Sequence, residues 1–108
     1  MDWRGTWVNQ YGSVVRIEDD AAGRISGTFE TALEDSGFYG EIVPIVGVAS
    51  GNCISFASVC KGKAGDMAVA YTGLLREGRL ETAWHYVADD RPWWKAVITN
   101  TNTFERRN

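Results

Sequence analysis

The stretch MAVAYTGLLR (67–76), followed by EG (77–78) and RLETAWHYVA (79–88), decides the fold of this chain. Both flanks show hydrophobic alternation at a period of two, which is typical of strands with one face in a core. Glu77-Gly78 is a short joint with turn chemistry, and so short a joint favours antiparallel neighbours. The stretch therefore predicts a β-hairpin.

The same alternation recurs along the chain, and no amphipathic helix of convincing length interrupts it. Turn residues such as Ser50-Gly51-Asn52 separate the segments at regular spacing. The expected strands are Gly5–Tyr11, Ser13–Glu18, Arg24–Ala32, Glu41–Val48, Cys53–Lys61, Met67–Arg76, Arg79–Ala88 and Trp93–Arg106. Eight antiparallel strands either stack as a sandwich or close into a barrel, and closure removes edges that invite aggregation. We predict an all-β, eight-stranded antiparallel up-and-down barrel with its two ends close together.

Length and composition limit the alternatives. The 108 residues suit a single domain over residues 1–108, and 44% hydrophobic with 23% charged residues is ordinary for a soluble globular protein. Lysine and arginine are scattered and the net charge is -3, so nucleic acid is not an expected partner. No apolar run approaches the ~20 residues of a membrane helix, and Met1-Asp2-Trp3-Arg4 does not begin a signal peptide.

The stretch GTWVNQYGS (5–13) carries the most specific signal. Asn9, Tyr11 and Ser13 alternate onto one face, and a buried Asn without a partner is costly, so a polar group should meet it. This stretch closely resembles the first-strand signature of the avidin and streptavidin family. The resemblance continues in order through ISGTFETA (25–32), YTG (71–73), ETAW (81–84), WKA (94–96) and NTF (102–104).

The resemblance implies an avidin-like barrel that binds biotin at its mouth, catalyses nothing and needs no cofactor. By resemblance, Asn9 and Ser13 donate to the ureido oxygen of biotin. Thr31 and Asn102 accept from its two nitrogens. The other site positions implied in this way are Tyr11, Phe29, Leu33, Cys60, Val69, Tyr71, Trp84 and Trp94.

Four pocket positions depart from the family pattern: Phe29 replaces a Tyr, Cys60 a Trp, Val69 a Thr that touches the ring sulfur, and Tyr71 a Trp or Phe. The segment between Cys60 and Tyr71 varies in length in the family, so Asp66 or Lys63 is an alternative to Val69. Phe29 removes a donor to the ureido oxygen, and Cys60 removes an aromatic wall. We therefore expect high- to moderate-affinity binding, short of the family's limit.

Trp94 matches the Trp that the family's tetramers lend to a neighbouring subunit. This implies a homo-oligomer, with four subunits as the first expectation and two as the second, in a secreted or periplasmic protein. The alternative is a structural or interaction protein with weak or no biotin affinity, which kept the barrel and binds a peptide or another small cyclic ligand.

The remaining features are less specific. Residues 34–40 form one longer polar and aromatic connection, either a lid at the barrel mouth or a plain surface loop. Cys53 and Cys60 lie seven residues apart on one expected strand, hence on opposite faces, so free thiols are favoured and a disulfide between subunits through Cys53 stays open. His85, the only His, should face away from the pocket, which disfavours a catalytic pair with Cys60 and a metal site.

Overall fold

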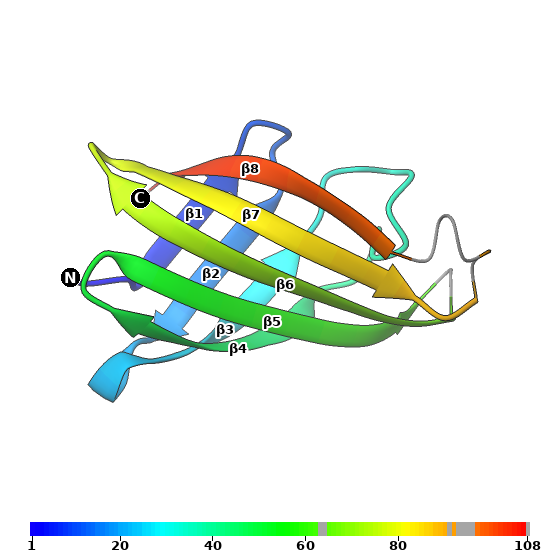
Figure 1. Cartoon of the computed structure of the whole chain (residues 1–108), viewed down its shortest axis with the longest axis horizontal. Helices are drawn as coiled ribbons and strands as arrows, with labels where there is room; N and C mark the ends of the chain where they lie inside the picture. The colour runs from blue at the N-terminus through cyan, green and yellow to red at the C-terminus, as the bar shows by residue number, and fades with distance from the viewer. Residues whose placement is uncertain (63–64, 91, 93–96, 108) are drawn as a thin grey trace.

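The computed structural model describes residues 1–62, 65–90, 92 and 97–107. Its strands are β1 (Gly5–Asn9), β2 (Val14–Asp19), β3 (Arg24–Glu30), β4 (Val43–Ser50), β5 (Cys53–Gly62), β6 (Gly65–Arg76), β7 (Arg79–Ala88) and β8 (Val97–Arg107). Each strand pairs antiparallel with the next, and β8 pairs back onto β1 (Figure 1). The predicted closed barrel is therefore confirmed, including the hairpin of β6 and β7.

Closure joins the two ends of the chain. Asn9 of β1 lies opposite Phe104 of β8, and the register continues to Thr6 opposite Arg107. The Arg106 guanidinium also donates to the carbonyl oxygen of Asp2. Figure 1 accordingly shows both termini at the same end of the barrel, as the sequence predicts.

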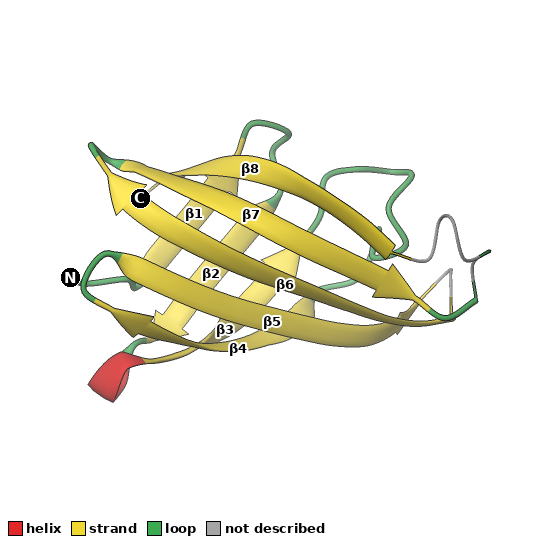
Figure 2. Cartoon of the chain, in the orientation of Figure 1, coloured by secondary structure: helices red, strands yellow, loops and turns green. Residues whose placement is uncertain are grey.

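Side-chain hydrogen bonds explain where some strands end earlier than expected. The Asn9 side-chain oxygen accepts from the backbone amides of Tyr11 (3.0 Å) and Ser13 (2.9 Å), which turns the chain at Asn9 rather than at Tyr11. The expected turn before β3 contains a single 3₁₀ turn, η1 (Ala21–Gly23; Figure 2). Among the described residues, no helix is long and apolar enough to cross a membrane.

The end of the barrel near the termini is plugged by two tryptophans. Trp7 is 2% exposed, and its indole N–H donates to the Trp3 carbonyl oxygen at 2.9 Å. The two ring centroids lie 5.7 Å apart, and the Arg106 guanidinium lies 4.6 Å from the Trp7 ring. Trp7 thus packs the barrel floor and leaves the opposite end for a cavity.

Replacing Trp7 with Ala should lower the free energy of unfolding by about 3–5 kcal/mol, the range for truncating a buried aromatic side chain. Urea unfolding followed by circular dichroism measures this. Glu105→Ala, at an exposed position of β8, is the control and should change stability by less than ~0.5 kcal/mol. Equal unfolding midpoints for the two variants would contradict the floor role of Trp7.

Candidate ligand-binding site

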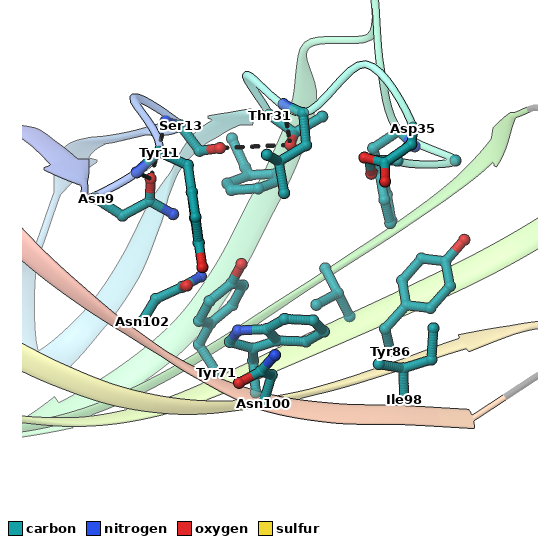
Figure 3. A pocket seen from close by; sticks show the side chains of 17 residues that line it. Asn9, Tyr11, Ser13, Thr31, Asp35, Tyr71, Tyr86, Ile98, Asn100 and Asn102 are labelled. Atoms are coloured by element: carbon teal, nitrogen blue, oxygen red, sulfur yellow. Dashed lines mark hydrogen bonds between the residues drawn. The ribbon is translucent and has the colours of Figure 1, made fainter. Parts of the chain in front are cut away.

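A cavity of about 290 Å³ lies inside the barrel at the end away from the Trp plug. Its size suits one small ligand. Ten of the site residues predicted from the sequence line it together: Asn9, Tyr11, Ser13, Phe29, Thr31, Leu33, Val69, Tyr71, Trp84 and Asn102 (Figure 3). Tyr11 (56% exposed) and Leu33 (40% exposed) lie at its rim.

Backbone amides anchor the polar groups on one side of this cavity. Because the Asn9 side-chain oxygen already accepts from two amides of the β1–β2 turn, its Nδ2 is left to face inward. Ser13 Oγ accepts from the amide of Ala32 at 2.9 Å and lies 3.4 Å from Thr31 Oγ1. Thr31 Oγ1 in turn accepts from the amide of Leu33 at 3.2 Å. These buried groups are held in place before any ligand binds.

Asn102 of β8 connects this polar group to the aromatic wall. With its amide oriented to suit its surroundings, its oxygen accepts from Asn9 Nδ2 at 3.2 Å and from Trp84 Nε1 at 3.1 Å. Closure of the barrel is what brings Asn9 and Asn102 together, because they lie on β1 and β8. The Asn102 oxygen has two lone pairs, so these two donors already occupy it.

Aromatic rings form the opposite wall. Tyr71 stacks on Phe56 with ring centroids 5.0 Å apart and a 16° interplanar angle. Trp84 lies at 6.3 Å from Tyr71, and Phe104 packs edge-on at 5.9 Å. Burial raises the pKa of Tyr71 to about 12. The Tyr71 hydroxyl therefore stays protonated at any ordinary pH.

The connection between β3 and β4 covers part of the cavity. Phe38 is only 2% exposed and packs edge-on against Phe29 (6.3 Å) and Tyr86 (5.8 Å). A Cβ on Gly37 would lie 2.4 Å from the Met67 sulfur, so no larger residue fits there without a shift. Of the two interpretations of residues 34–40, the geometry favours a segment that closes over the barrel mouth.

Two predicted site residues are not placed in the cavity. Cys60 lies on β5 opposite Met67, half-buried against the core, and borders a separate hollow with Asp66 and Val59. The expectation that Cys60 lines the ligand cavity is thus wrong. Phe38, inserted from the β3–β4 connection, supplies aromatic surface to the cavity that Cys60 does not. Trp94 lies outside the described residues.

The interior of the cavity suits the uncharged part of a ligand. Asp35, exposed at the rim, is the one formally charged side chain among the described lining residues. The described part of the chain contains no cluster of three or more His, Cys, Asp or Glu that could hold a metal ion. His85 is exposed on the outer surface, where its Nδ1 lies 2.9 Å from Thr99 Oγ1. Burial, and to a smaller extent the negative charge of Glu41, raises the pKa of the Cys60 thiol. Cys60 lies on the inward-facing side of β5 and His85 on the outer surface, so these two residues do not form a nucleophile–base pair.

Several lining residues were not found from the sequence: Asp35, Ser36, Gly37, Phe38, Tyr86, Ile98 and Asn100. Strand parity offers a signal for Tyr86, which is two positions after Trp84 and so shares its face. The residues of the β3–β4 connection are not in a strand, so strand parity does not predict which of them face the cavity. Their inward position depends on how the loop folds back.

A closed barrel with a plugged floor and a cavity that is polar on one side and aromatic on the other defines a small-ligand-binding barrel protein. The Avidin family model matches residues 1–107. The chain belongs to the avidin family, as its sequence motifs predict.

Solved structures agree on the fold. The bradavidin2–biotin complex superposes with a TM-score of 0.87 at 19% identity, covering 100% of both chains. The rhizavidin–biotin complex gives 0.83 at 22% identity, covering 99% of this chain and 93% of that one. The biotin binding protein from chicken gives 0.76 at 27% identity, covering 99% and 97%. No curated protein sequence matches the chain.

We expect Phe38→Ala to release the β3–β4 connection, because truncating a buried Phe costs about 3–5 kcal/mol and this ring is the buried anchor of the loop. Hydrogen exchange of the amides of residues 33–42 should become at least about tenfold faster. Ile42→Ala, at a side chain that is 62% exposed, is the control. Equal exchange in both variants would show that Phe38 does not hold the loop.

Proposed function

We propose that this chain binds biotin in the cavity without catalysis and without a cofactor. One observation carries the proposal: buried Asn9, Ser13, Thr31 and Asn102 come together at one side of a cavity whose other walls are aromatic and aliphatic. Biotin has the matching chemistry, with a compact polar ureido head on an apolar ring. Family membership and the biotin complexes among the structural neighbours support the same ligand.

The hydrogen bonds that each polar residue already makes within the protein decide whether it donates to the ligand or accepts from it. Asn9 Oδ1 already accepts from two backbone amides, so Asn9 presents Nδ2 as a donor to the ureido oxygen. The Ser13 oxygen accepts from the Ala32 amide, and its O–H donates to the same ureido oxygen. Thr31 and Asn102 accept hydrogen bonds from the two ureido N–H groups. For Asn102 this requires that Asn9 Nδ2 turns from its oxygen to the ligand, which exchanges one hydrogen bond for another.

The apolar part of the ligand packs against Phe29, Tyr71 and Trp84, with Val69 and Phe38 also lining the cavity. We propose moderate to high affinity, below the ceiling that the tightest biotin complexes reach. Val69 offers no hydroxyl to the ring sulfur, and Phe29 offers none to the head.

Calorimetric titration with biotin tests the proposal, and Ser13→Ala tests the site. Losing a hydrogen bond to a buried polar ligand group costs about 1–3 kcal/mol, so Ser13→Ala should weaken binding by about five- to a hundredfold. Ser26→Ala, on the outer face of β3, is the matched serine control and should bind as the wild type does.

Because Ser13 Oγ also holds the Ala32 amide, the unfolding temperature of each variant is measured alongside. A wild-type protein that binds no biotin contradicts the proposed function and favours a structural or interaction role. Equal affinity of Ser13→Ala and wild type contradicts the assigned site.

We further propose that the chain self-associates through the outer face of β4 to β8. Val59, Ala68, Val87 and Val97 are direct cross-strand neighbours and form one row across four strands. Val59 is 69% exposed and Val97 is 64% exposed. Contiguous exposed apolar surface of this kind marks an interaction site.

The central part of this face differs from the outer face of β2 and β3 in that its described positions carry no formally charged side chains. The outward positions of its central part are Val46, Val48, Ser55, Ala57, Val59, Ala68, Ala70, Thr72, Ala83, His85, Val87, Val97, Thr99 and Thr101, which include no Asp, Glu, Lys or Arg. The outer face of β2 and β3, in contrast, carries Arg16 and Glu30, whose charged groups approach to 3.8 Å. A second copy of the chain, bearing the same face, is the partner that we propose, in a tetramer first and a dimer second.

Val59→Lys should reduce the assembly to one chain, because it places an unpaired charge in a desolvated interface. Light scattering after size exclusion gives the mass. Ser26→Lys, on the charged outer face of β3, is the control and should keep the wild-type mass. A wild-type protein with the mass of one chain at high concentration would refute self-association.

A further inference from the structure

Phe29 and Tyr71 both line the cavity, and their rings are in contact, with centroids 6.0 Å apart. Phe29, on β3, is 6% exposed and has no polar atom to offer. Tyr71, on β6, is 5% exposed and carries a hydroxyl. Phe29 therefore offers the cavity no hydroxyl, whereas Tyr71 offers one.

The Tyr71 ring is fixed by its neighbours. It stacks on Phe56 at 5.0 Å and contacts Trp84 and Phe104 at 6.3 and 5.9 Å. With rings on several sides, the ring has little freedom to turn, so the position of its hydroxyl is set by packing. The hydroxyl points from β6 toward the part of the cavity that holds Asn102 (Figure 3).

A buried phenol hydroxyl needs a hydrogen-bond partner. The Tyr71 hydroxyl lines the same cavity as the buried side chains of Asn9 and Asn102. The Asn102 oxygen already accepts from Asn9 Nδ2 and Trp84 Nε1. A hydroxyl has one donor and two acceptor positions, so the Tyr71 hydroxyl can bond a polar ligand group beside these residues.

We propose that the Tyr71 hydroxyl is a hydrogen-bonding partner of the ureido head and takes the place of the hydroxyl that Phe29 does not offer. This inference rests on the proposed function and gives Tyr71 a polar role in addition to its place in the apolar wall. It also makes Tyr71 a determinant of specificity for a polar head over an apolar one.

Tyr71→Phe removes this hydroxyl and keeps the ring. Biotin affinity measured by calorimetry should fall by about five- to a hundredfold, the range for losing a hydrogen bond to a buried polar group. Ser26→Ala, which removes an exposed hydroxyl from the outer face of β3, is the control, and its affinity should stay within about threefold of wild type.

Desthiobiotin separates a contact with the head from a contact with the sulfur, because it keeps the ureido ring and lacks the sulfur atom. The proposal requires the same fold-loss on Tyr71→Phe for biotin and for desthiobiotin. A loss confined to biotin would overturn it, since the hydroxyl would then act on the sulfur.

The hydroxyl replacement is tested by Phe29→Tyr in two backgrounds. In the Tyr71→Phe background, Phe29→Tyr should tighten biotin binding by several-fold more than it does in the wild-type background, because the new hydroxyl at position 29 then replaces the hydroxyl that position 71 has lost. Equal effects in both backgrounds would overturn the proposal.

The failure of this inference differs from the failure of the proposed function. If the wild-type protein binds biotin, and Tyr71→Phe is folded and binds biotin with the same affinity, only the role of Tyr71 is overturned. Wild-type protein that binds no biotin overturns both.

Discussion

Pairing of β1 with β8 is the constraint on which the rest of the structure depends. These strands come from opposite ends of the chain, and their ladder removes the two sheet edges that an open sheet would expose. The same ladder places Asn9 beside Asn102, and their side chains hydrogen-bond. A chain that failed to close would lose the barrel and the contact between Asn9 and Asn102 together.

Two kinds of interaction then fix the cavity. Backbone amides hold the oxygens of Asn9, Ser13 and Thr31, which ties the polar groups to the β1–β2 turn and to the residues after β3. Aromatic packing holds Tyr71 on the other side. Pre-organisation of this kind lowers the entropy that binding costs, because few side chains must be ordered when a ligand enters.

Local chemistry made much of the site predictable. Strand parity puts Asn9, Tyr11 and Ser13 on one face, and the ordered motifs assign partners on β3, β7 and β8. Parity also explains the error at Cys60, which does face inward but lies outside the cavity. A period of two says which face a residue joins. It says nothing about the depth at which a cavity ends.

By itself, the sequence determined the strands, their antiparallel order and the polar residue types of the site, because each follows from hydrophobic alternation, turn chemistry and local motifs. Only the tertiary structure decided what depends on contacts between distant segments. Phe38 is an aromatic residue in a loop without periodicity, and its burial follows from packing against Phe29 and Tyr86. Asn9 and Asn102 are distant in sequence in the same way, and they become neighbours only when the barrel closes.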